Sequence, residues 1–134
     1  MGLGAGSSQD GVPVKEENPK PQGWVQQVSE LNSAYKAMSR VLLDGTMVAS
    51  KLDAGDAAMK IKWAEMHGML ETLNTFIGEV RNTVSKAAAC TSDTGYDEEV
   101  QHHMTNLLEQ SGVHLYGYKE AYKRMKPYLV SSQG

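Results

Sequence analysis

The four histidines are the residues of this chain with the broadest range of chemistry, because imidazole binds metal ions and exchanges protons near neutral pH. They are His67, His102, His103 and His114. Glu99 precedes His102 by three positions, which is the Glu-x-x-His spacing of di-iron carboxylate bundles. Those sites need a second such motif and two further glutamates, and we find one copy. We therefore expect no metal site, and a histidine-dependent metal enzyme is a minor alternative to histidines at the surface or the core edge.

Cys90 is the only cysteine, so the chain cannot form an intramolecular disulfide. The sequence places it at the end of a helix, where the negative end of the helix dipole opposes a reactive thiolate. Gly2, Gly4 and Gly6 alternate as in glycine-rich loops, but no strand precedes them. The sequence thus predicts no catalytic residue, no cofactor and no enzymatic activity.

The composition is that of an ordinary small, soluble globular domain. The chain has 134 residues, of which 40% are hydrophobic and 22% charged, and a formal net charge of −3. No basic face is evident, so there is no strong signal for nucleic-acid binding. No apolar run approaches the ~18 residues of a transmembrane helix, and the N-terminus lacks signal-peptide features. The default location is a reducing interior, or export without a cleaved signal peptide.

Residues 1–22 consist mainly of Gly, Ser, Pro, Gln and charged residues. Such a segment cannot bury enough apolar surface to offset its ordering entropy, so we predict a disordered tail. Gly2 follows Met1 as in N-myristoylated proteins, but that pattern requires Ser or Thr at the sixth position, where this chain has Gly6. N-terminal lipidation is therefore only a weak alternative.

From Trp24 onward, apolar residues recur in alternating steps of four and three, the spacing of a helical face and of coiled coils. This spacing predicts a first helix over residues 24–52, a second from about residue 59 to residue 89 or 90, and a third from residue 96 or 97. The second helix has the most regular apolar face, which comprises Met59, Trp63, Met66, Leu70, Leu73, Ile77, Val80, Val84 and Ala87.

Asp53 to Asp56 supply the predicted turn between the first two helices. Gly55 tolerates the left-handed conformation that ends many helices, and either aspartate is able to cap the next helix. Pro127 should end or kink the third helix, and residues 131–134 should form a frayed C-terminus.

Three amphipathic helices joined by short turns bury their apolar faces together. We therefore predict an all-α fold, an antiparallel three-helix bundle with long helices, over residues 23–130. The alternative is an elongated helical hairpin whose long apolar faces are completed by another chain.

Five glycines fall inside the predicted helices, where each costs about 1 kcal/mol relative to alanine. Either they allow close helix approach or local bending, or the helices break there into shorter segments. The sequence leaves both readings open. These glycines are Gly45, Gly68, Gly78, Gly112 and Gly117.

The chain contains eight methionines, and such flexible side chains suit either an adaptable core or a groove for a partner helix. We expect a non-catalytic interaction or assembly protein that packs through helical faces against itself or a helical partner. Its setting would be a filament, a virion, a larger complex, export without a signal peptide, or regulation by binding. The alternative is a small-molecule or lipid carrier with a cavity lined by Met, Trp63 and Tyr. The candidate partner-binding residues are Met59, Met66, Met69, Phe76, Tyr116 and Tyr122.

Overall fold

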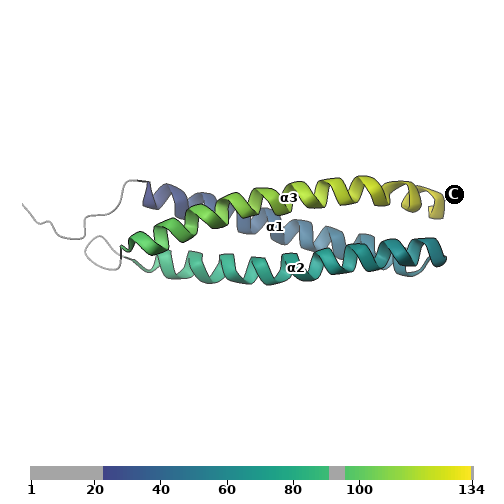
Figure 1. Ribbon diagram of the computed structural model, residues 1–134, viewed down its shortest axis with the longest axis horizontal. Helices are drawn as coiled ribbons and strands as arrows, with labels where there is room; N and C mark the ends of the chain where they lie inside the picture. Colours follow the sequence, from purple (N-terminus) through teal and green to yellow (C-terminus); the bar gives the residue numbers. More distant parts are fainter. Residues whose placement is uncertain (1–22, 91–95, 134) are drawn as a thin grey trace, which may run out of the picture.

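The computed structural model describes residues 23–90 and 96–133. It contains three helices, α1 (Trp24–Asp53), α2 (Ala57–Ala88) and α3 (Glu98–Gln133), and no strand in this part of the chain. Figure 1 shows the helices running along one another, with α2 antiparallel to its two neighbours in sequence. The predicted all-α three-helix bundle is confirmed. The alternative was a helical hairpin completed by another chain, but here α3 of the same chain packs against α1 and α2. The predicted tail, residues 1–22, lies outside the described residues.

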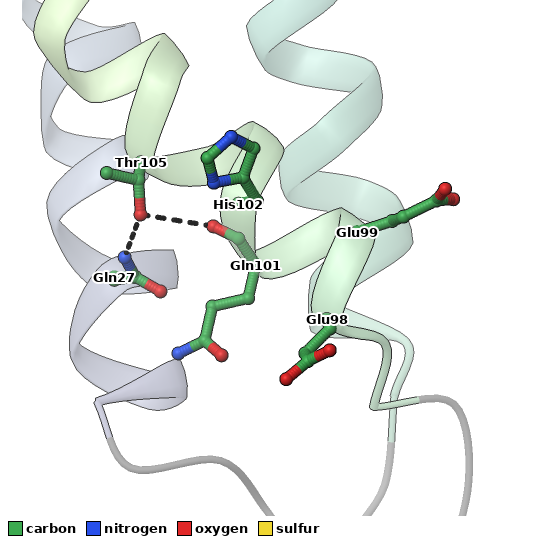
Figure 2. A pocket seen from close by; sticks show the side chains of 6 residues that line it. All are labelled: Gln27, Glu98, Glu99, Gln101, His102 and Thr105. Atoms are coloured by element: carbon green, nitrogen blue, oxygen red, sulfur yellow. Dashed lines mark hydrogen bonds between the residues drawn. The ribbon is translucent and has the colours of Figure 1, made fainter.

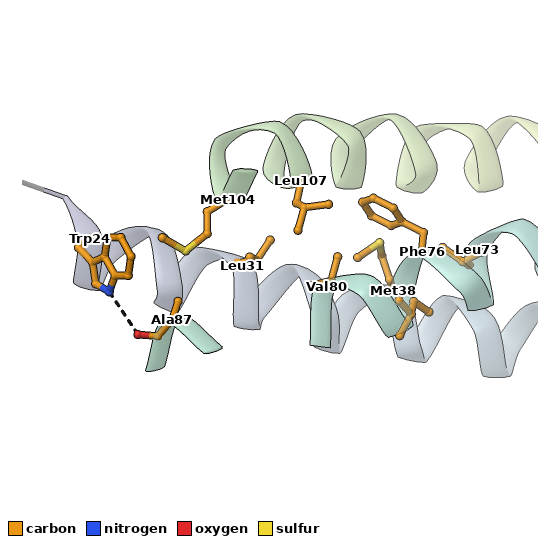
Figure 3. Close-up of a cluster of buried hydrophobic side chains, with 10 residues drawn as sticks. Trp24, Leu31, Met38, Leu73, Phe76, Val80, Ala87, Met104 and Leu107 are labelled. Carbon is orange, nitrogen blue, oxygen red and sulfur yellow. Dashed lines mark hydrogen bonds between the residues drawn. The ribbon is translucent and has the colours of Figure 1, made fainter. Parts of the chain in front are cut away.

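The core consists of two apolar clusters that follow one another along the bundle. Both clusters draw residues from all three helices, because the steps of four and three keep each apolar face directed inward along its whole length. The cluster nearer the start of α1 comprises Trp24, Leu31, Met38, Leu73, Phe76, Ile77, Val80, Ala87, Met104 and Leu107 (Figure 3). The cluster nearer the α1–α2 turn comprises Val48, Ala49, Leu52, Met59, Met66, Leu70, Tyr118, Ala121, Met125 and Leu129.

The α1–α2 turn lies at the predicted residues, but the role of its glycine differs from our expectation. Asp56 is the N-cap of α2, and its carboxylate accepts a hydrogen bond of 3.0 Å from the backbone N–H of Met59. Among the described glycines only Gly23 has a positive φ, of 84°. The constraint at Gly55 is steric instead, because a Cβ there would lie 2.2 Å from the Met59 sulfur.

Trp24 joins the three helices at the other end of the bundle. Its indole Nε1 donates a hydrogen bond of 3.3 Å to the carbonyl oxygen of Ala87 in the last turn of α2. Its ring also packs edge-on against Tyr96, just before α3, with the ring centroids 5.1 Å apart. One side chain therefore aligns the start of α1 with the end of α2 and the start of α3.

The helix α3 does not end at Pro127 but continues to Gln133, so the backbone is helical over residues 131–133, which the sequence predicts as a frayed end. Proline in a helix removes the hydrogen bond to the carbonyl four residues earlier. Pro127 and Lys123 are both exposed, so water is able to bind that carbonyl instead. The cost of the proline is thereby reduced.

The helices also continue without a break through all five internal glycines. Gly45 is buried where the three helices meet, and a Cβ there would lie 2.6 Å from Leu70 Cδ2 and 3.1 Å from Tyr118 Cε1. This glycine therefore allows close helix approach. At the other four positions a Cβ would have no neighbouring atom within 4 Å, so packing does not account for them.

Candidate interaction surface

The histidines do not converge on one site. His67 stacks on Trp63 with ring centroids 5.1 Å apart, and its Nε2 lies 3.4 Å from the Glu71 carboxylate on the same helix. His103 of α3 lies across from α2, with its Nε2 3.4 Å from Glu79. Among the described residues, no group of three or more His, Cys, Asp or Glu side chains is placed to hold a metal ion.

His114 lies against the core, where its ring is 4.5 Å from the ring of Phe76 between centroids. Partial burial removes water from the imidazole and lowers the pKa of His114, because the charged form loses more hydration than the neutral form. This histidine is therefore held toward its neutral form, and it packs as a ring between α2 and α3.

The Glu99–His102 pair lines an open hollow of about 560 Å³ at the start of α3. Figure 2 shows the two side chains pointing in different directions, so they do not form a common ligand set. Gln27 of α1 crosses to α3, where its Nε2 donates a 2.8 Å hydrogen bond to the hydroxyl of Thr105. That hydroxyl donates in turn to the carbonyl oxygen of Gln101 at 3.2 Å. The hydrogen bond between Gln27 and Thr105 therefore links α1 to α3 at this hollow.

Two further hollows lie between α1 and α2. One, of about 470 Å³ near the Trp24 end, is mainly apolar and includes Val28, Val84 and the half-buried Cys90. The thiol of Cys90 donates to the Lys86 carbonyl oxygen at 3.6 Å. The other hollow, of about 570 Å³, contains Trp63, but its other lining residues are mostly polar or small rather than Met and Tyr.

The structure places most of the predicted partner-binding residues in the core or at its edge. Met59, Met66 and Phe76 are buried within the bundle itself, and Met66 has no exposed surface at all. Met69 and Tyr122 are half-buried beside the second core cluster. Tyr116, by contrast, is 65% exposed on the outside of α3. Residues on the apolar face of each helix are the ones that packing within the bundle buries.

The exposed apolar side chains lie on the opposite faces of the helices. On α1, Leu43 is 67% exposed and Met47 is 60% exposed, one helical turn apart. On α3, Val113 is 69% exposed and lies one turn from Tyr116. The periodicity of the apolar faces did not indicate Leu43, Met47 and Val113, because these residues lie off those faces. The available signal was a large apolar residue three or four positions from another on a face that is otherwise polar.

No helix in the described part of the chain is both long enough and apolar enough to cross a membrane. Comparison of the chain with protein-family models, with curated proteins and with solved structures finds no match.

Proposed function

We propose that this chain is a non-catalytic interaction or assembly protein that binds through the outer faces of its helices. The observation that carries the proposal is the pair of adjacent, exposed apolar residues on α1 and a second pair on α3. Exposed apolar side chains that are isolated are common on protein surfaces. Adjacent ones, rimmed by polar residues, are typical of protein contact sites.

Site-specific photocrosslinking tests this proposal in cells that produce the protein. A photoreactive residue at position 43 or 116 should give discrete adducts with protein, identified by mass spectrometry as another protein or as a second copy. The same residue at position 61 is the control, because Ile61 is an exposed apolar residue of α2 without an equally exposed large apolar residue one turn away. Equal or absent protein adducts at all three positions would contradict the proposal.

A small-molecule or lipid carrier is the second candidate, and the apolar hollow beside Trp24 favours it. A fatty acid or detergent bound there should quench or shift the fluorescence of Trp24, and Val28→Asp should abolish the effect. Trp63→Phe removes the only other indole, so that the signal is assigned to Trp24 alone. No change in fluorescence over a titration with fatty acids and detergents would dismiss the carrier.

A further inference from the structure

Each exposed apolar pair lies between two charges of the same sign along its helix. One exposed charge of the opposite sign also lies beside each pair, Asp44 on α1 and Lys119 on α3, and the Asp44 carboxylate accepts a hydrogen bond from the Tyr118 hydroxyl. On α1, Arg40, Leu43, Met47 and Lys51 form a basic strip, and on α3, Glu109, Val113, Tyr116 and Glu120 form an acidic strip. Within each strip the residues follow at steps of three and four, so the four side chains share one helical face. In both strips the outer charges are 11 residues apart, which is about 16 Å along a helix.

Most of the flanking charges form no ion pair with another described residue. Arg40, Lys51 and Glu109 are exposed and have no ion-pair partner among the described residues. Glu120 lies 3.2 Å from Lys123 in the next turn of its own helix. Exposed ion pairs of this kind contribute little to stability, so Glu120 is readily available to another partner.

We propose that the basic strip of one copy binds the acidic strip of a second copy. This inference rests on the proposed function, and it names the partner. Placing the strips face to face brings Leu43 and Met47 against Val113 and Tyr116, and sets each cation opposite a carboxylate. Because the charges are equally spaced in the two strips, this match holds whether the two helices run parallel or antiparallel.

The charges also determine which strips are able to pair. If two basic strips faced each other, Arg40 and Lys51 of one copy would lie against the same cations of the other. Two acidic strips would likewise place carboxylates against carboxylates. Repulsion between like charges disfavours both symmetric contacts. Basic against acidic is the complementary arrangement. Each copy has one strip of each kind on two different helices, so the complementary contact leads to a closed dimer with two such contacts, to a larger ring or to a chain of copies.

Sedimentation equilibrium of the purified full chain at low and high salt tests the proposal. We expect the average mass to rise with protein concentration at low salt, and the association to weaken at high salt because screening shortens the range of the ion pairs. A basic-strip variant, Arg40→Glu with Lys51→Glu, should weaken self-association about ten-fold or more, since it opposes like charges. An acidic-strip variant, Glu109→Lys with Glu120→Lys, should do the same.

The decisive measurement is the mixture of the two charge-reversed variants. In the mixture each reversed strip meets a complementary one, so association should return toward the wild-type strength although each variant alone associates more weakly. Arg81→Glu with Lys86→Glu is the matched control, because it changes the net charge as the basic-strip variant does but lies on exposed positions of α2. Thermal unfolding followed by circular dichroism verifies that all variants are folded.

Three outcomes would overturn the inference: a wild-type chain that stays monomeric at every concentration, variants that associate like wild type, or a mixture that fails to associate. A monomeric chain leaves the proposed function standing if crosslinking at position 43 or 116 captures a different protein. The experiments therefore distinguish a failure of the self-association proposal from a failure of the proposed function.

Discussion

At the scale of single residues, Gly45 shows why one glycine is constrained while others are not. Gly45→Ala should lower the free energy of unfolding by roughly 1 to 2 kcal/mol, because overpacking against Leu70 and Tyr118 exceeds the gain in helix propensity. Gly68→Ala should instead raise it by up to about 1 kcal/mol, since a Cβ there meets no atom within 4 Å. Urea unfolding measures both, and a stabilising Gly45→Ala would show that the contact is not tight.

His114 provides a pH dependence with a defined sign. Its pKa is lowered in the folded chain by burial, so the unfolded chain binds more protons once the pH falls toward the unperturbed value of about 6.5. Stability should therefore decrease on acidification from about pH 7.5 to about pH 5.5. His114→Leu should show a smaller decrease in the urea midpoint over this window. An identical decrease would contradict the assignment.

The Glu65 carboxylate provides a second pH dependence, at lower pH than that of His114. Arg124 of α3 donates a hydrogen bond of 2.6 Å to the Glu65 carboxylate of α2 and lowers the pKa of Glu65. The stabilisation from this pair is therefore present above the carboxyl's ordinary pKa and is lost as the pH falls through its lowered value. Since Glu65 titrates below the range of His114, the two effects are separable by pH.

At the scale of elements, the two aspartates of the α1–α2 turn test which of them caps α2. Asp56→Ala should destabilise the chain by about 1 kcal/mol, because the backbone N–H of Met59 loses its acceptor. Asp53→Ala should change stability little, because its carboxylate forms only an exposed ion pair of 3.5 Å with Lys60. Thermal unfolding of the two variants compares them directly, and equal losses would rule out the specific cap.

At the scale of the whole molecule, Trp24 holds together three chain segments that are distant in sequence. Trp24 is almost fully buried, so Trp24→Ala should cost about 3 to 5 kcal/mol in free energy of unfolding. Trp63→Ala is the matched control, because Trp63 is only half-buried and should cost less. Guanidinium unfolding followed by circular dichroism gives both values. A smaller loss for Trp24→Ala than for Trp63→Ala would show that the contacts of Trp24 with Ala87 and Tyr96 do not stabilise the bundle.

Much of the bundle could be predicted from the sequence because helix formation and amphipathicity are local properties. The apolar spacing from Trp24 to Ala87 predicted the first two helices to within a few residues, and the aspartate-glycine turn was placed at the correct residues. Local rules left open whether the third helix ends or kinks at Pro127, and the structure shows that it does not end there. They were wrong at Gly55, where the constraint is the Met59 side chain rather than a left-handed backbone. Both outcomes depend on what surrounds a residue.

The candidate surface required the folded chain. Periodicity determined by itself which residues share a face of one helix: Met66 and Leu70 lie together on α2, and on α1 Leu43 lies off the face that carries Met38. Only the packing of three helices decided which of these faces is covered, since exposure depends on atoms contributed by distant parts of the sequence. The same packing buried most of the predicted partner-binding residues and left Leu43, Met47, Val113 and Tyr116 at the surface.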